Sequence, residues 1–298
     1  MSGQPTGGSG IDNANSVKQT NDNGYIVAGY SSSSDGDVGS NNGGYDFWLV
    51  KLTSAGVLDW EANFGGNEND FPNSVQQTND GGYIIAGGSQ SSDGDVGGNN
   101  GSYDMWIVKL SATGILEWET NLGGSSWDTA NSIVQTSDGG YILGGGSSST
   151  DGDVGGNNGE SDFWIVKLTA SGTIDWETNF GGSYEETAYS IQQTLDGGYI
   201  VAGTSSSSDG DVGGNYGSYD YWIVKISVTG TLEWEKNLGG SNDDEPNTIK
   251  QTADGSYIVG GYSLSSDYDV PSNYHDYSSN PTFDYWIVKI GPNGDIQE

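Results

Sequence analysis

The sequence has very little positive charge. Of its 298 residues, eight are Lys, none is Arg and one is His, whereas 41 are Asp or Glu, so the formal net charge is −33. A chain this acidic repels a phosphate backbone and an anionic membrane surface instead of neutralising them. We therefore expect no nucleic-acid partner.

Cysteine and long apolar runs are also absent. The lack of Cys excludes disulfides, thiolate metal sites and cysteine nucleophiles. The apolar runs, such as 47–50, are far too short to span a bilayer, and residues 1–5 have neither a basic start nor an apolar stretch. We expect no membrane insertion and find no signal peptide pattern in this chain.

Aromatic residues and glycines are plentiful, and a repeat organises them. Ten Trp and 18 Tyr argue against disorder, because disordered acidic chains are poor in aromatics. A Tyr-Ile pair returns every 58 residues, and the same step relates the Gln and Asp residues around it. The tyrosines of these pairs are Tyr25, Tyr83, Tyr141, Tyr199 and Tyr257. The chain therefore contains five copies of one unit.

Each copy contains four short segments with strand character. In the first copy they are residues 16–20, 25–29, 46–52 and 58–64, and a long polar loop, 31–45, separates the second from the third. Five four-stranded units, each too small to bury its own faces, predict an all-β, five-bladed β-propeller with antiparallel strands. An open β-solenoid is the alternative, although its coils are usually shorter. We expect a single propeller domain over 1–298, with blades at about 7–64, 65–122, 123–180, 181–238 and 239–298.

The repeat resembles known propeller families. Strands that end in small residues, such as 26–29, are followed by an Asp-x-Trp strand, a turn and a second Trp, which is similar to the kelch order. The frame Tyr-Ile-x-x-Gly, Asp-x-Trp-Ile-Val-Lys-Leu and Gly-x-Leu-x-Trp-Glu resembles the bacterial SBBP-type repeats more closely. That resemblance implies a secreted or cell-surface protein, especially of Bacteroidota. The kelch resemblance implies that the Ser-x-x-Gln-Thr strand is innermost and the Trp-Glu strand outermost.

The two ends of the sequence suggest how a ring would close. In register, Glu298 falls where Trp60 stands, so the fifth outer strand ends half-built. Residues 2–6 align with 60–64 and are expected to supply the other half. A piece cut from a longer array is the alternative.

The polar loop is the candidate metal site. Its Asp-x-Asp start, an Asn at the seventh position and an Asp at the twelfth resemble the oxygen-ligand spacing of a looped Ca²⁺ site. Asx side chains that cap their own loop are the alternative. The residues are Asp35, Asp37, Asn41, Asp46; Asp93, Asp95, Asn99, Asp104; Asp151, Asp153, Asn157, Asp162; and Asp209, Asp211, Asn215, Asp220. We expect a weak site or none in the fifth loop, where Pro271 follows and Asp284 is displaced.

A second set of acids precedes the first strand of each repeat. It consists of Asp12, Asp70, Asp128, Glu186 and Asp244. In the kelch order these residues lie near one mouth of the central channel, where they would bind a cation or water. The alternative is that each one caps the turn entering its strand.

The remaining repeated side chains have structural interpretations. The strand lysines, such as Lys51, have Glu61 and its equivalents as expected cross-strand partners. Trp48 and its equivalents are expected between blades rather than stacked on sugars. The candidates for ligand contact are Tyr45, Tyr103, Tyr219 and Trp127.

The arrangement of the carboxylates favours a binding scaffold over an enzyme. Some five-bladed propellers are glycosidases with paired carboxylates, but such a pair needs two different environments, and nearly every acid here is one of five equivalents. The neighbouring His275 and Asp276 are weak evidence for general-base chemistry. We expect no catalytic residues and a non-enzymatic, calcium-stabilised scaffold, extracellular or at the cell surface, that binds polysaccharide or a surface protein. The alternative is a subunit that assembles with copies of itself into a filament or layer, and a glycoside hydrolase is a third hypothesis.

Overall fold

A computed structural model describes residues 6–270 and 282–297. Within these ranges the regular secondary structure consists of β-strands, and no described residue lies in a helix. No helix in this part of the chain is long and apolar enough to cross a membrane.

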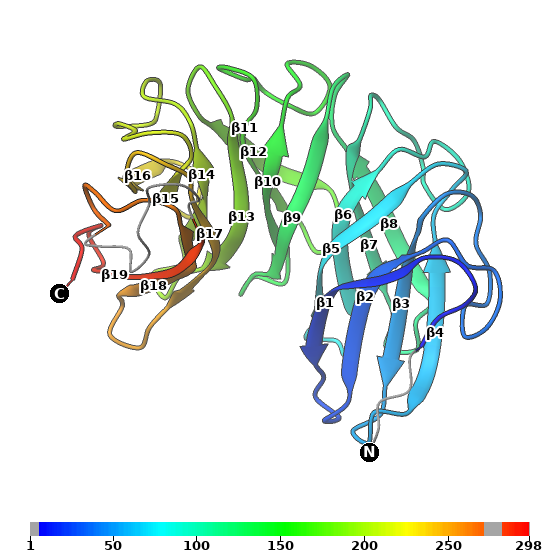
Figure 1. The fold of residues 1–298 in the computed structure, drawn as a ribbon. Helices are drawn as coiled ribbons and strands as arrows, with labels where there is room; N and C mark the ends of the chain where they lie inside the picture. The colour runs from blue at the N-terminus through cyan, green and yellow to red at the C-terminus, as the bar shows by residue number, and fades with distance from the viewer. Residues whose placement is uncertain (1–5, 271–281, 298) are drawn as a thin grey trace. The chain divides into compact units, whose positions relative to one another are not determined.

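The strands form one antiparallel sheet for each repeat (Figure 1). In the first repeat, β1 (Asp12–Gln19), β2 (Tyr25–Ser31), β3 (Asp46–Leu52) and β4 (Leu58–Phe64) follow one another in space as in sequence. The second repeat has β5 (Asp70–Gln77), β6 (Tyr83–Ser89), β7 (Asp104–Leu110) and β8 (Leu116–Leu122). The third has β9 (Asp128–Gln135), β10 (Tyr141–Ser147), β11 (Asp162–Leu168) and β12 (Ile174–Phe180). The fourth has β13 (Glu186–Gln193), β14 (Tyr199–Ser205), β15 (Asp220–Ile226) and β16 (Leu232–Leu238), and the fifth has β17 (Asp244–Gln251), β18 (Tyr257–Ser263) and β19 (Asp284–Ile290).

The chain divides into two compact units. Unit 1 comprises Met1–Tyr141 with Asp151–Asp153 and Leu168–Thr173. Unit 2 comprises Ile142–Thr150, Val154–Lys167 and Ile174–Glu298. Each sheet begins and ends within one repeat. The expected single domain and its blade boundaries remain predictions.

The core of unit 1 lies between its first two sheets. Successive side chains of a strand point to opposite faces, so Phe47 and Leu49 point to one side of β3 and Trp48 and Val50 to the other. The Phe47 ring packs against the Trp106 indole with ring centroids 4.5 Å apart, and both side chains are fully buried. The expectation that this tryptophan fills the space between sheets is confirmed.

Unit 2 repeats this packing. Phe163 contacts Trp222 and Tyr221 contacts Trp286, with centroids 4.6 Å apart in each pair. The last sheet differs, because the side chain of Tyr285 on β19 is 96% exposed, whereas its repeat equivalent Tyr221 is fully buried. Among the described residues of unit 2, no further sheet covers the side of β19 that bears Tyr285.

The first strands of neighbouring repeats lie side by side within each unit. The Ser16 hydroxyl of β1 accepts a hydrogen bond from the Val75 amide of β5 at 3.3 Å. In unit 2 the Ser190 hydroxyl of β13 accepts one from the Ile249 amide of β17 at 3.2 Å. This is the arrangement expected of an innermost strand.

The start of the first strand differs from the sequence prediction, and the completion of the fifth sheet falls mostly outside the described residues. β1 begins at Asp12 instead of Ser16, because pairing with β2 continues past a bulge between Ala14 and Ser16. The fifth sheet has three strands, followed only by an isolated bridge between Ile290 and Ile296. The expected completion of this sheet by residues 2–6 falls almost wholly on residues outside the described ranges, and so do His275 and Asp276.

Candidate functional site

The two ends of each sheet have different chemistry. In the first sheet, Asp12, Ser31 and Asp46 stand side by side in register, and we call this the aspartate end. At the opposite end Tyr25 pairs with Leu52, next to Lys51, and we call this the lysine end. Repetition of the sequence gives the other sheets the same two ends.

The acid at the start of each first strand accepts hydrogen bonds from the segment that connects its sheet to the preceding one, such as residues 65–69. We call this segment the link. Asp70 is fully buried, and its carboxylate accepts hydrogen bonds from the Gly66 amide at 2.9 Å and from the hydroxyls of Ser89 and Ser91. The amides of Gly8, Gly124, Gly182 and Gly240 donate in the same way to Asp12, Asp128, Glu186 and Asp244. These hydrogen bonds cap the turn into the strand. The channel-mouth role of this set remains a prediction.

The first half of each polar loop is tied to the same link. The Asp35 carboxylate accepts a hydrogen bond from the Ser9 amide at 2.7 Å, and Asp37 accepts one from the Gly7 amide at 3.3 Å. The second repeat has the same pairs, Asp93 with Asn67 and Asp95 with Gly65. Asp151, Asp153, Asp209 and Asp211 repeat these bonds, to Ser125, Gly123, Ser183 and Gly181 respectively.

The second half of the loop folds back on itself. The Asn41 amide group donates to the Ser31 carbonyl at 2.8 Å and accepts from the Gly43 amide at 2.9 Å. Asp46 accepts from the Asn42 amide at 2.6 Å. Asn99, Asn157 and Asn215 form the same contacts as Asn41, and Asp104, Asp162 and Asp220 the same contact as Asp46.

The four residues proposed as ligands in one loop thus have separate hydrogen-bond partners. No three Asp, Glu or His side chains in the described ranges are placed so that they could hold a metal ion by themselves. Calcium in these loops therefore remains a prediction. In the fifth loop Asp267 keeps its bond to the Ser241 amide, but the part from Pro271 onward lies outside the described residues.

The structure brings together a different set of acids. Burial, together with the negative charges of Asp70 and Asp95, raises the pKa of Asp46 to about 7, although the hydrogen bond from the Asn42 amide lowers it. Burial likewise raises the pKa of Asp220 to about 7, and that of Asp104 and Asp162 to about 6. In every case the nearby charges belong to the next repeat, which sequence spacing within one loop does not reveal. The glycine that leaves room for this meeting, Gly65, was missed, although a Gly-Gly pair recurs in each link.

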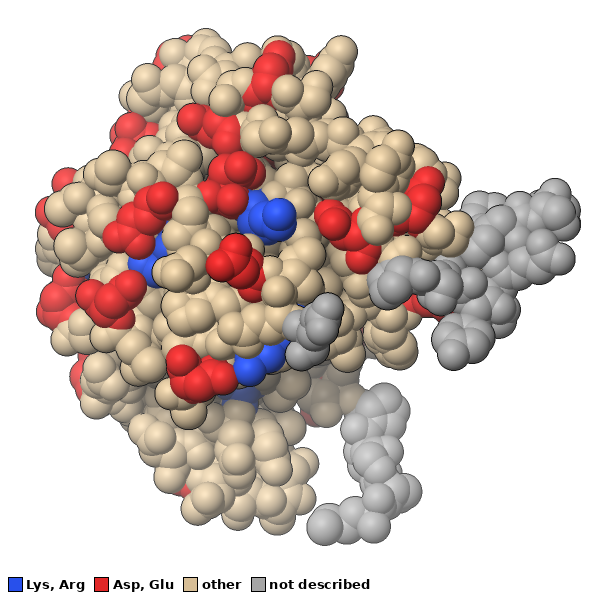
Figure 2. Space-filling model, turned by 90° about the vertical axis from the view of Figure 1, so that its left-hand side faces the viewer, with Lys and Arg blue, Asp and Glu red and all other residues tan. Residues whose placement is uncertain are grey.

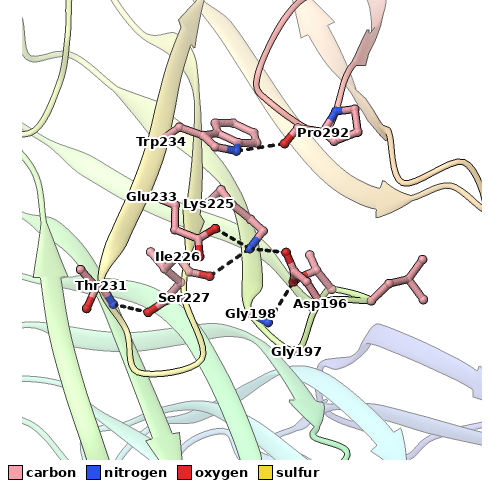
Figure 3. A network of polar contacts seen from close by, with 12 residues as sticks. Asp196, Gly197, Gly198, Lys225, Ile226, Ser227, Thr231, Glu233, Trp234 and Pro292 are labelled. Atoms are coloured by element: carbon pink, nitrogen blue, oxygen red, sulfur yellow. Dashed lines mark hydrogen bonds and ion pairs between the residues drawn. The ribbon is translucent and has the colours of Figure 1, made fainter.

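At the lysine end the chain neutralises its own charge. The buried Lys51 ammonium lies 2.8 Å from the Asp22 carboxylate, whose pKa is held well below its usual range by that hydrogen bond. Lys109 contacts Asp80 at 3.0 Å and Glu117 at 2.9 Å. Figure 3 shows the same network in unit 2, where Lys225 lies 3.1 Å from Asp196 and 2.9 Å from Glu233.

The partners of these lysines differ from the sequence prediction. Glu61 was expected to pair with Lys51, but it stands opposite Val50 and accepts a hydrogen bond from the Trp48 indole at 3.1 Å. Glu119, Glu177 and Glu235 accept the equivalent bonds from Trp106, Trp164 and Trp222. The expected cross-strand pairing was wrong, because register places the tryptophan of the outer strand, not the glutamate, opposite the lysine.

Half-buried aromatic side chains gather beside the aspartate end of unit 1. The ring of Tyr45 lies 5.1 Å from Tyr30 and 5.4 Å from Phe71, and Phe71 lies 6.4 Å from Tyr103, measured between ring centroids. We call these four residues the aromatic row. Trp127, 38% exposed, forms a backbone bridge with Tyr103.

The remaining aromatic candidate lies in unit 2. There the Tyr219 hydroxyl donates to Glu185. This hydrogen bond orients the ring beside an acidic side chain, and Tyr219 is not part of the aromatic row.

Acidic side chains are spread over the molecular surface. Figure 2 shows Asp and Glu distributed across the face in view, with a few lysines each next to acidic side chains. The dispersed charge marks no single acidic pocket on this face.

Comparison with solved structures assigns the fold. The WD40 domain of Neurospora crassa Pan2 superimposes with a TM-score of 0.55 at 10% sequence identity, over 96% of this chain. The chain has a β-propeller fold. It spans 65% of the length of that Pan2 chain. The WD40 β-propeller domain of Doa1 is a more distant match, with a TM-score of 0.35, 11% identity and coverage of 84% of this chain and 90% of that one.

The sequence comparisons give no family. No family model matches the sequence, and no curated protein does. The five sheets are the blades of a propeller, as predicted from the repeat. Because the Pan2 and Doa1 domains are only 10% and 11% identical to this chain, their similarity to it concerns the fold alone.

Proposed function

We propose that this propeller is a non-enzymatic binding scaffold, of the kind that the kelch-like and bacterial SBBP-type resemblance implies, acting outside the cell and stabilised by calcium. The observation that carries the proposal is the aromatic row. Tyr30, Tyr45, Phe71 and Tyr103 are only half buried, so they offer ring faces and edges, with three hydroxyls, on the surface. Such amphipathic rings suit a polysaccharide, whose sugar rings have apolar faces and polar rims.

The arrangement of the acids favours binding over catalysis. A glycosidase needs two carboxylates with different pKa values in one asymmetric pocket. Here the carboxyls with raised pKa, such as Asp46 and Asp104, are buried equivalents in successive repeats. Repetition of similar surfaces supports avidity for a repeated ligand.

Glycan-array binding tests this function. Replacing Tyr45→Ala and Tyr103→Ala together should abolish polysaccharide binding while the circular dichroism spectrum stays unchanged. The matched control is Tyr25→Ala, which removes a tyrosine that is 36% exposed at the lysine end of the same unit. Equal binding by the double variant and the control would contradict the proposal.

Self-assembly is the second candidate function, and the uncovered face of β19 favours it. Tyr285 and Ile287 are 96% and 68% exposed, whereas Tyr221 and Ile223, their repeat equivalents, are fully buried. In unit 2 the face bearing Tyr221 packs against the tryptophan of the next sheet, Trp286.

The first sheet offers a surface of the matching kind. A hollow on this sheet is lined by Val27, Trp48 and Val50, and Trp48 is the repeat equivalent of Trp286. In a chain whose own two units leave these faces free, the β19 face of one copy would therefore fit the hollow of a second copy. A head-to-tail contact of this type produces filaments or closed rings of subunits.

Light scattering across a range of protein concentrations tests the second candidate. The wild type should form oligomers that Tyr285→Ser with Ile287→Ser abolishes. Ile115→Ser, which changes an equally exposed side chain in unit 1, should leave them intact. A strict monomer at high concentration would contradict self-assembly.

A further inference from the structure

A group of three carboxylates recurs where one repeat meets the next. In its first copy Asp46 comes from the first repeat, and Asp70 and Asp95 from the second, around the link residue Gly65. We call each copy an inter-repeat acid cluster. The other copies are Asp104, Asp128 and Asp153 around Gly123; Asp162, Glu186 and Asp211 around Gly181; and Asp220, Asp244 and Asp269 around Gly239. Each copy lies wholly within one unit.

At least one carboxylate oxygen in each cluster is buried without a partner. Asp46 has no exposed surface, and its Oδ2 atom accepts a hydrogen bond from the Asn42 amide, but its Oδ1 atom has none. Oδ1 of Asp104, Asp162 and Asp220 is orphaned in the same way. Burying an unsatisfied carboxylate oxygen is costly, and such atoms are rare in folded proteins. Its recurrence in four copies calls for a ligand that supplies the missing contact.

The orphaned oxygen points at a second carboxylate. The position that a Cβ atom on Gly65 would take lies 2.5 Å from Oδ1 of Asp46 and 2.6 Å from Oδ2 of Asp70. The same position on Gly181 lies 2.4 Å from Oδ1 of Asp162 and 2.6 Å from Oε2 of Glu186. Two acidic oxygens therefore approach the same glycine so closely that a side chain there would collide with both.

The chain's own cations lie elsewhere. On β7, Asp104 stands at the aspartate end, whereas Lys109 lies near the lysine end and contacts Asp80 and Glu117. Asp46 and Lys51 are divided between the two ends of β3 in the same way. A positive charge for these clusters must therefore come from solution.

We propose that each inter-repeat acid cluster binds one Ca²⁺ ion between the orphaned oxygen of its strand aspartate and the acid of the following first strand. Calcium takes six to eight hard oxygen ligands at flexible distances. Two carboxylate oxygens, with the third acid of the cluster nearby and water for the rest, fit a site of low affinity, in the ~10⁻⁴–10⁻³ M class of extracellular modules. This inference rests on the calcium stabilisation in the proposed function, but assigns it to residues of two repeats instead of one loop.

The four described copies of the cluster each lie within a single unit, two in unit 1 and two in unit 2. We therefore expect these four copies to bind one ion each.

Equilibrium dialysis of the full chain against millimolar CaCl₂, after EDTA treatment and its removal, tests the inference. The wild type should bind four ions, and Asp46→Asn should bind three. Asp35→Asn is the matched control, because Asp35 belongs to the same polar loop but to no cluster, and it should keep all four. Gly65→Ala, which places a methyl group between the two oxygens, should also lose one ion, with circular dichroism confirming that both variants are folded.

The possible failures are distinguishable. Loss of an ion from Asp35→Asn together with four ions in Asp46→Asn would overturn the cluster and leave calcium in the loop. No bound calcium in the wild type would overturn both calcium assignments, while glycan binding would still be judged by the aromatic-row variants.

Discussion

The two ends of a single strand, β7, handle buried charge in opposite ways. At one end Lys109 is 3% exposed and shared between Asp80 and Glu117, so the chain supplies both signs of charge. At the other end Asp104 is fully buried next to further acids, and its pKa is raised to about 6 by burial. The lysine end is complete within one repeat, whereas the aspartate end joins acids of two repeats, for which we propose a Ca²⁺ ion from solution.

The difference shows how so acidic a chain folds with so few cations. Lys109 and Lys225 lie where a carboxylate from a turn and one from an outer strand both contact them, and Lys51 and Lys289 contact the carboxylate of the turn. At the aspartate end the carboxylates instead accept hydrogen bonds from backbone amides, as Asp128 does from the Gly124 amide at 2.8 Å. Hydrogen bonds to charged acceptors are stronger than neutral ones, so the acids help to fix the links between sheets.

The largest expected effect comes from leaving the buried lysine without carboxylates. Asp80→Asn combined with Glu117→Gln should lower the free energy of unfolding by about 3 kcal/mol, because an uncompensated buried charge remains. Asp80→Asn alone should cost much less, since Glu117 still contacts Lys109. Urea denaturation monitored by tryptophan fluorescence measures both variants. An equal loss of unfolding free energy in the single and the double variant would show that the Lys109 ammonium is solvated. The two ends of the strand would then not differ in how they hold buried charge.

The sequence predicted the strands much better than the charge contacts. The third and fourth strands, 46–52 and 58–64, were predicted with their observed bounds, because the continuous apolar run of the first and the alternating apolar pattern of the second depend on local residues only. The partner of Lys51 was missed, because a long side chain passes its strand neighbours and reaches the turn at Asp22. Asp46, Asp70 and Asp95 were each singled out, but they were assigned to separate sets. Their meeting depends on how two sheets are joined at Gly65, which a repeat pattern does not contain.

At the aspartate end, the effect of a neutral substitution on the free energy of unfolding should be opposite in sign with and without calcium. Without calcium at pH 8, Asp104→Asn should raise the free energy of unfolding by about 1–3 kcal/mol, because it removes a buried carboxylate that has no cation. With saturating calcium the same variant should be less stable than the wild type, since it loses a ligand. Thermal melts of both proteins in EDTA and in CaCl₂ measure the change. If the stability of the variant relative to the wild type is the same in both buffers, Asp104 is not a calcium ligand and the aspartate end does not take a cation from solution.

The smallest expected effect is the acid response of the lysine end. Burial raises the pKa of Asp80, but its hydrogen bonds, chiefly from Thr78, outweigh burial and lower the pKa to about 2, from an ordinary value of 3.8. The unfolded chain therefore takes up a proton before the folded chain does, so this stabilisation is present above pH 4 and is lost as the pH falls towards 2. Because the Asp80 side chain is 59% exposed, solvent screening limits the contribution to less than about 1 kcal/mol. The comparison of wild type with Asp80→Asn by urea denaturation between pH 5 and pH 2 should show the two stabilities converging as the pH falls. A difference that stays constant over this range would mean that the Lys109 ion pair does not lower the proton affinity of Asp80, and that the lysine end is held by packing instead of charge.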